Sequence, residues 1–346
     1  TYPVEYPLPG VPGTHLIVGD FAGNLWWMPD VSGGRGLPRY EGLRYEKTRP
    51  GIAYGKRYLA EHGRAYAKPR QRICDESGKP LLIGVGMQSG VAFAGGNARP
   101  TLYRNPDTGS DDLLVIAGTV RNAVIYLERA NPRDRGTPVF RNRGEVEIDG
   151  ADVSRFGGHA PIVAGADGGI LIPRTWKMGV FACAGCAAGV PRFAFQRWVA
   201  GADARACGYN YTEVLRDRSG RRWLLDNPTR FELYELKTRG AQVRLSSEPV
   251  VVEDQRGPFI PESETDVNTA ADWGFHRAAR WDFDGSGRQH LVVGTDKGLL
   301  YLLVDDAGEA AGPPARFRSV GPLRDVRGAV IRLHNRACAA GVDLDG

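Results

Sequence analysis

Short apolar runs alternate with glycine-centred polar turns along most of the chain. Residues 276–294 and 159–172 show the pattern most clearly: each has an apolar run, an Asp-Gly turn and a second apolar run, and the two turns align residue for residue. Apolar runs of this length, bounded by turn residues, predict β-strands rather than helices. Further copies of the turn end at Gly78, Gly109, Gly220 and Gly346.

A pattern that returns every roughly 40 to 50 residues, with several strands in each copy, is typical of a β-propeller. We therefore predict an all-β fold in which four-stranded antiparallel blades surround a central channel. Six inner strands can be counted, and they start near residues 67, 97, 159, 209, 276 and 337.

The composition favours one domain over residues 1–346, because the 46 Gly and 23 Pro indicate many turns and no linker-like stretch divides the chain. Residues 343–346 end in a turn with no second strand after it, whereas 14–19 and 24–27 resemble second and third strands without a first. We expect the two ends to complete one blade, which would remove exposed sheet edges. The alternative is that the sequence stops short of the natural C-terminus.

No apolar stretch is long enough to span a bilayer, so we expect no membrane association. The start at Thr1 is typical of a trimmed, secreted protein. The net charge is +5, with 38 Arg against 7 Lys. Arginine binds carboxylates in a bidentate manner, which favours an acidic ligand, although a GC-rich genome would produce the same excess. The arginines are scattered and no basic helix is evident, so we expect no nucleic-acid partner and a monomer.

The inner strands of a propeller begin at one face of its channel, so the first residues of each copy should line a shared pocket. These residues are Lys68, Asn97, Arg99, His159, Tyr209, Asn210, Tyr211, His276, Arg277, His334 and Arg336. Each has a structural alternative: a hydrogen-bonded turn for histidine, ring packing for tyrosine, a surface ion pair for arginine. The expected convergence of all these residues on one pocket is more informative than any single one of them. His15 and His290 instead lie beside second strands.

This set of side chains limits the chemistry. Glycoside hydrolysis ordinarily needs two carboxylates, and none converge at these positions. Motifs for a serine or cysteine nucleophile are missing too. Histidine, tyrosine and arginine suit β-elimination at a uronic acid: a cation neutralises the carboxylate, a base removes the C5 proton, and an acid protonates the leaving oxygen. This reaction needs no organic cofactor.

The repeats that contain Asp282-Phe-Asp-Gly and Asp343-Leu-Asp-Gly, together with the histidine-bearing inner strands, resemble secreted seven-bladed propeller lyases. Those enzymes cleave ulvan or rhamnose-glucuronate caps. The resemblance implies seven blades and an acidic polysaccharide or oligosaccharide as substrate. It also implies that His159, His276, Tyr209 or Tyr211 serve as base and acid, and that Arg277 or Arg99 neutralises the uronate.

Two segments are candidates for a structural metal. Residues 282–287 begin like a calcium loop, but Ser286 replaces the third acidic ligand and makes Ca²⁺ a weak prediction. Cys183 and Cys186 have zinc-ligand spacing, with Cys207 as a possible third ligand. A disulfide from Cys183 or Cys186 to Cys207 explains the same pattern equally well.

Two other functions remain open. The first is a carbohydrate-binding module, a lectin or adhesion domain, in which Trp26, Trp27, Trp176 and Trp273 would stack on sugar rings. The second is a rhamnosidase that depends on an isolated histidine. Only elimination creates a conjugated double bond, so the product separates the lyase from both.

Overall fold

The computed structural model describes the chain in segments that together contain strands and turns and no helix. The described residues are 2–13, 15–20, 23–35, 37–41, 43–47, 65–69, 71–83, 98–117, 123–150, 163–164, 169–174, 177–198, 200–201, 213–217, 219–226, 231–239, 242–259, 277–281, 288, 290–294, 299–306 and 313–331. The all-β class predicted from the sequence is confirmed. Within these residues, no helix has the length and hydropathy needed to cross a bilayer.

Five sheets of three or more strands make up the described structure, and we number them along the chain. The first sheet has the order β1 (Tyr2–Glu5), β2 (Leu16–Gly19), β3 (Leu25–Met28). The second has the order β6 (Arg99–Arg104), β7 (Asp111–Ala117), β8 (Ala123–Arg129), β9 (Phe140–Glu145). The third has the order β11 (Val163–Ala164), β12 (Ile170–Arg174), β13 (Lys177–Ala187), β14 (Val190–Trp198), β10 (Glu147–Asp149).

The fourth sheet has the order β16 (Glu213–Arg216), β17 (Arg222–Asp226), β18 (Glu232–Arg239), β19 (Gln242–Leu245), β15 (Ala200–Gly201), and β20 (Val250–Val251) also pairs with β18. The fifth has the order β23 (Arg277–Trp281), β24 (His290–Gly294), β25 (Leu300–Asp305), β26 (Phe317–Pro322). Two smaller sheets pair β4 (Leu43–Lys47) with β5 (Ala65–Pro69) and β21 (Glu253–Asp254) with β22 (Gly257–Pro258).

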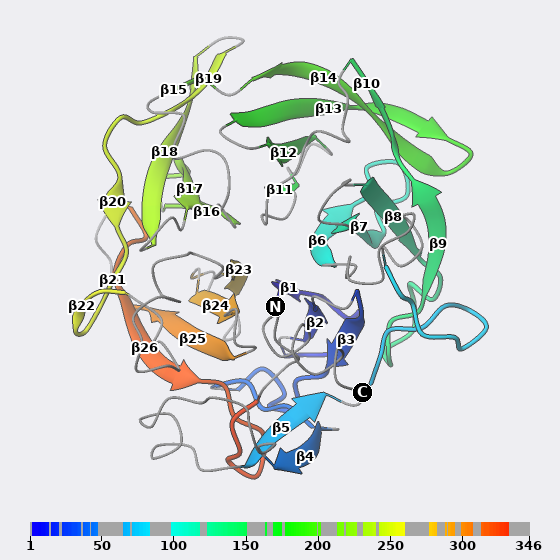
Figure 1. The fold of residues 1–346 in the computed structure, drawn as a ribbon, viewed down its shortest axis with the longest axis vertical. Coiled ribbons are helices and arrows are strands. Elements are labelled where there is room, and N and C mark those ends of the chain that lie inside the picture. The colour runs from blue at the N-terminus through cyan, green and yellow to red at the C-terminus, as the bar shows by residue number, and fades with distance from the viewer. Residues whose placement is uncertain are drawn as a thin grey trace, which may run out of the picture.

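Figure 1 shows the five sheets around a common centre, with β1, β6, β11, β16 and β23 nearest to it. Neighbouring innermost strands contact each other in the order β16, β23, β1, β6, β11. Parallel pairing joins the outer parts of successive sheets. The paired elements are Cys74 with Val139, β10 with β14, β15 with β19, Glu253 with Arg316, and Asp325 with Tyr40. These links run from each sheet to the next and from the fifth back to the first.

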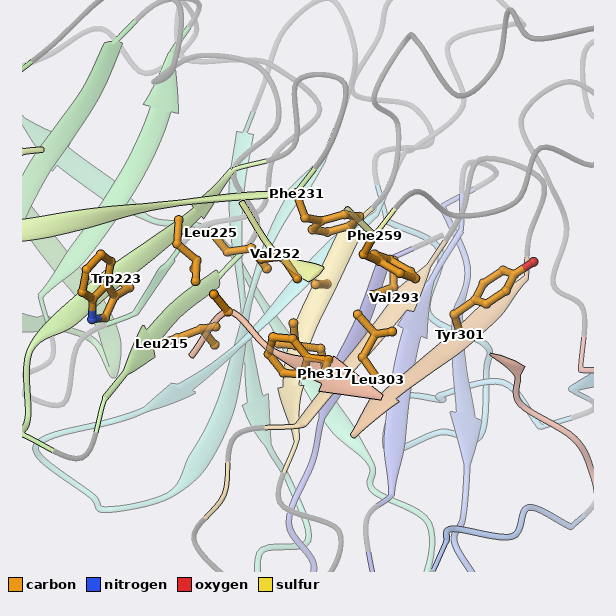
Figure 2. Packing of buried hydrophobic residues seen from close by; sticks show 14 of the residues in the cluster. Leu215, Trp223, Leu225, Phe231, Val252, Phe259, Val293, Tyr301, Leu303 and Phe317 are labelled. Carbon is orange, nitrogen blue, oxygen red and sulfur yellow. The ribbon is translucent and has the colours of Figure 1, made fainter. Parts of the chain in front are cut away.

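Alternating residues of β2, β7 and β24 pack against the two neighbouring sheets. In β7, Leu113 and Val115 pack toward the first sheet, whereas Leu114 and Ile116 pack toward the third. Figure 2 shows the corresponding cluster between the fourth and fifth sheets, which includes Trp223 and Leu225 of the fourth sheet and Val293 and Leu303 of the fifth. Because both faces of a strand are buried, its sequence is apolar throughout rather than alternating.

An apolar cluster joins the fifth sheet to the first. Val292, Leu300 and Leu302 of the fifth sheet pack in one cluster with residues of the first, including Leu16 and Trp26. Tyr40 is fully buried in the same cluster and forms the parallel bridge to Asp325. The closing contact therefore involves a segment that follows β3 of the first sheet.

The edge strand of the first sheet differs from our expectation. The N-terminal segment Tyr2–Glu5 pairs with β2, so the prediction that the C-terminal segment supplies this strand is wrong. A proline is tolerated in β1 because an edge strand has one side where no N–H is needed. Residues 332–346 lie outside the described part.

One copy of the repeat differs from the prediction, and the sheet count of the described residues can be compared with the predicted blades. The described residues contain five sheets of three or more strands, fewer than the six or seven predicted. The copy read from residue 67 is not an inner strand: Arg72 bridges Trp26, which places residues 71–74 on the outer edge of β3. The segment between β3 and residue 71 is therefore an insertion between the third strand of the first sheet and its outer edge.

One turn occurs four times with the same hydrogen bonds. It spans Asp-x-x-Gly at 20–23, 75–78, 217–220 and 325–328, and its glycine N–H donates to the aspartate carbonyl at 2.9–3.2 Å. The glycine has φ between 81° and 86° in all four, a conformation that glycine adopts without strain. The aspartate side chain also accepts the N–H four residues on, at 2.9–3.0 Å.

Candidate functional site

The starts of the inner strands form the predicted site. Arg99 is the first residue of β6, and Arg277 is the first residue of β23. His276 immediately precedes β23, and the other predicted catalytic residues precede inner strands along the chain: His159 comes before β11, and Tyr209 and Tyr211 come before β16. These four lie outside the described residues, so their placement stays a prediction.

Arg99 is the predicted ligand-binding residue whose side chain the structure describes. It is fully buried and engaged with other groups of the protein. The preceding residue, Ala98, donates its N–H to the carbonyl of Asp20 at 3.0 Å, which fixes the start of β6 against the end of β2. A buried guanidinium must be compensated by hydrogen bonds or opposite charge. Arg99 is thus a fixed cation beside the inner strands, and its contact with a substrate stays a prediction.

The remaining predicted binding residues are not brought to the same place by the described structure. Lys68 lies in β5, which pairs with β4 and lies far from the innermost strands in Figure 1. Lys68 therefore does not start an inner strand, because the segment that contains it belongs to the insertion. Asn97, Asn210, His334 and Arg336 lie outside the described residues.

Cys183 and Cys186 lie in β13, where an irregular register brings both near the β6–β7 turn. Tyr103 donates its hydroxyl to the Cys183 sulfur at 3.9 Å. Burial and a hydrogen bond to Asp107 raise the pKa of the Cys186 thiol to about 12. Both are free thiols, so the disulfide alternative is not supported.

The metal predictions find no further support in what is described. In the described segments, no three His, Cys, Asp or Glu side chains are grouped to hold a metal ion. Cys207, the predicted third zinc ligand, and residues 282–287, the predicted calcium loop, lie outside those segments.

Two tryptophans proposed to stack on sugars are buried instead. Trp26 is 7% and Trp27 is 3% exposed. The indole of Trp26 donates to Asp20 at 2.8 Å, and the Arg72 guanidinium lies 5.2 Å from its ring centroid. Trp27 stacks on His15. Neither ring is available to a ligand, which weakens the lectin alternative; Trp176 and Trp273 lie outside the described residues.

The described tyrosines beside the inner sheets are not suited to act as bases. Burial raises the pKa values of Tyr6, Tyr103 and Tyr126 far above the ordinary tyrosine value. Tyr126 also donates to the Asp112 carboxylate at 2.6 Å, which holds its proton more firmly. Tyr209 and Tyr211 therefore stay the predicted catalytic tyrosines.

Two buried histidines in different sheets make the same backbone contact, which we did not predict. The Nδ1 atom of His15 accepts the N–H of Asp30 at 3.0 Å, and Nδ1 of His290 accepts the N–H of Asp305 at 2.9 Å. Both begin the sequence His-Leu-(Ile or Val)-Val-Gly, and this shared motif could have revealed the pair. In the second sheet Asp112, also followed by a Leu-containing strand, accepts the N–H of Arg129 at 2.8 Å in the same way. A side chain that accepts a backbone hydrogen bond therefore occupies this position in the first, second and fifth sheets.

Comparisons with known proteins give only distant likenesses. No protein-family model and no curated protein match the chain. A solved protein of unknown function from Bacteroides caccae is 11% identical, with a TM-score of 0.33, over 96% of this chain and 89% of that one. A functionally unknown protein from Desulfotomaculum acetoxidans is 11% identical, with a TM-score of 0.38, over 97% and 90%. A luciferin-regenerating enzyme is 11% identical, with a TM-score of 0.36, over 96% and 94%.

Proposed function

We propose that the ring of five sheets is a β-propeller and that its centre cleaves a uronic-acid-containing polysaccharide by β-elimination. The observation that carries the proposal is the convergence of inner strands: β16, β23, β1, β6 and β11 contact each other in sequence around one centre. Four of these strands begin at, or within four residues after, the polar residues His159, Tyr209, Tyr211, His276, Arg277 and Arg99.

The chemistry follows from those residue types. Arg277 binds the uronate carboxylate and neutralises its charge, which lowers the pKa of the C5 proton. The buried cation Arg99 adds positive potential. His159 or His276 removes the C5 proton, and the electron pair forms the C4–C5 double bond as the C4–O bond breaks. Tyr209 or Tyr211 protonates the departing oxygen. Each cleaved linkage therefore yields an unsaturated uronate on one fragment and a new reducing end on the other, with no cofactor consumed.

The net charge of +5 supports an anionic substrate. A positive protein surface raises the local concentration of a polyanion and its rate of association. The glycan itself, a rhamnose-glucuronate polymer being the one that the resemblance suggests, is part of the proposal. We also propose that the protein acts outside the cell as a monomer.

The decisive experiment incubates the full chain with a panel of uronate polysaccharides and follows two signals. A rise in ultraviolet absorbance together with new reducing ends supports elimination. New reducing ends without absorbance identify a hydrolase, and binding without either signal identifies a lectin. Both of these outcomes overturn the proposal.

Variants assign the residues. We expect His159→Ala and Tyr209→Phe each to lower turnover by at least about 100-fold, the usual share of a general acid or base. Arg277→Gln should raise KM as well. Arg318→Gln, an exposed arginine of the outer strand β26, is the matched control and should leave activity unchanged. Full activity in both the His159 and Tyr209 variants would move the chemistry to other residues.

A further inference from the structure

Besides their shared apolar cluster, the fifth and first sheets are joined by an inserted segment, residues 30–40, which we call the latch. Asp30 and Tyr40 form an antiparallel bridge with each other, and Val31 donates its N–H to the Arg39 carbonyl at 2.7 Å. Tyr40 then bridges Asp325, which follows the last strand of the fifth sheet. The latch thereby connects the first sheet to the fifth.

The latch is attached to the first sheet through a histidine. The N–H of Asp30, at the base of the latch, donates to Nδ1 of His15 at 3.0 Å. This contact requires a neutral imidazole, because a protonated ring carries a hydrogen on both nitrogens and can accept nothing. His15 is 2% exposed and stacks on the Trp27 ring, with centroids 5.4 Å apart and an angle of 29° between the ring planes.

The other ring nitrogen of His15, Nε2, does not offset the cost of protonating the ring. Nε2 of His15 is buried and has no hydrogen-bond partner among the described residues. A buried donor without a partner already costs about 1–3 kcal/mol. Adding a positive charge to this ring therefore introduces a buried cation and removes the acceptor that holds Asp30.

The charged groups around the latch do not reverse this conclusion. Burial lowers the pKa of His15, and the nearby Asp30 carboxylate opposes it only in part. Asp30 is itself occupied, because its carboxylate accepts from Ser32 and from the Arg39 N–H. Glu5 of β1 and Asp30 both act on Tyr40, whose pKa burial raises well above its ordinary value, and Asp325 faces Tyr40 from the fifth sheet.

We propose that His15 makes closure of the ring sensitive to acid: protonation of its imidazole releases Asp30 and opens the latch between the fifth and first sheets. His290 offers an internal control. It makes the same contact, but the N–H that it accepts belongs to Asp305 at the end of β25, so its bond lies within the fifth sheet. Its loss should not open the latch.

Amide hydrogen exchange of the full chain, corrected for intrinsic rates, tests this at about pH 7.5 and about pH 5, on either side of the ordinary histidine pKa. We expect exchange in residues 30–40 and 323–331 to accelerate at low pH. The gain should approach tenfold for each pH unit below about 6.5, as one linked proton requires. His15→Asn keeps an acceptor but cannot titrate, so its latch should exchange at the same rate at both pH values.

His290→Asn should retain the acid response of the latch. The proposal is overturned if the wild-type latch shows no acceleration in acid, or if His15→Asn responds as the wild type does. Should His15→Asn fail to fold, the wild-type exchange at the two pH values together with His290→Asn decides: an acid response that is lost in His290→Asn also overturns the proposal.

Discussion

The first and fifth sheets contain the same motif and use it differently. Residues 15–28 and 290–303 align without a gap, and each begins with a histidine that accepts a backbone N–H. In the fifth sheet this bond ends a strand of the same sheet, whereas in the first it holds the base of an insertion. The same histidine contact therefore holds two strands of the fifth sheet together, whereas in the first sheet it holds a segment that reaches the fifth sheet.

The largest effect should come from Gly19, at the end of the motif in β2. A Cβ added there would lie 2.0 Å from the Ala98 carbonyl oxygen and 2.7 Å from Pro100 Cδ. Backbone atoms held by the Ala98–Asp20 hydrogen bond cannot move aside, so Gly19→Ala should reduce the free energy of unfolding by about 3 kcal/mol or more. Urea denaturation measures it.

Gly136→Ala is the matched control for this prediction. Its added Cβ would meet only the flexible Asp134 side chain, at 3.4 Å, and Gly136 is not in the left-handed region. A change within about 0.5 kcal/mol is expected. If both variants lost the same free energy of unfolding, the close approach of β6 to β2 would not be the reason for a glycine at position 19.

The second-largest effect is expected at Trp27, where a substitution by leucine gives the first sheet the residue of the fifth. Its counterpart in the alignment is Leu302, and both pack toward the next sheet. Trp27→Leu removes the stack on His15 and the edge contact with Tyr6 at 6.3 Å. We expect a loss of about 2 kcal/mol in the free energy of unfolding, from the cavity and the lost ring contacts. Thermal and urea denaturation should agree; no loss would mean that the first sheet tolerates the smaller side chain of the fifth.

A third prediction extends the comparison to the fourth sheet, where Asp217 and Trp223 repeat the contact of Asp20 and Trp26. The Trp223 indole donates to Asp217 at 3.2 Å. Burial alone would raise the pKa of Asp217, but hydrogen bonds from Ser219, Trp223 and Arg221 lower it to about 2. A carboxyl with a depressed pKa stabilises the fold above its unfolded value, 3.8, and this contribution is lost as the pH falls toward 2.

Asp217→Asn should therefore destabilise the protein by about 2 kcal/mol at neutral pH and by progressively less below pH 3.8. Urea midpoints measured across that range test the sign. Asp306→Asn, at an exposed position, should change stability by less than about 0.5 kcal/mol. A loss for Asp217→Asn that is constant with pH would assign its effect to packing rather than charge.

The smallest effect belongs to the outer surface between the first and second sheets. Arg141 of β9 pairs with Glu76 of the 75–78 turn and with Glu128 at 3.2 Å. All three side chains are substantially exposed, so Arg141→Gln should cost less than about 1 kcal/mol. The difference from wild type should shrink further in high salt. A larger, salt-independent loss would show that this pair contributes to the junction as the buried clusters do.

The sequence predicted the strands and the all-β class because both depend on local information. The Asp-Gly and Ser-Gly turns, and apolar runs such as Leu113–Ile116, mark strands without reference to the rest of the chain. The predicted inner-strand start at Arg99 is confirmed as the first residue of β6.

Other features could not be predicted because they depend on distant pairing. Nothing near Tyr2–Glu5 shows that its partner is β2, and its prolines argue against a strand unless the strand is known to be an edge. The insertion that contains Lys68 interrupts the repeat, so its strands were counted as a copy. The burial of Trp26 depends on Asp20 and Arg72, and sequence spacing alone does not distinguish such a ring from one that faces a ligand.

Closure by the latch also bears on how the protein reaches its native state during synthesis. Successive sheets can dock on one another as they leave the ribosome, because each cluster between neighbours is formed by nearby parts of the chain. The face of the first sheet that carries Leu16, Val18 and Met28 is different, since it has to wait for the residues of β24 and β25. Until then a nascent chain carries an uncovered apolar face, which makes it the surface where chaperones would bind and where aggregation would begin.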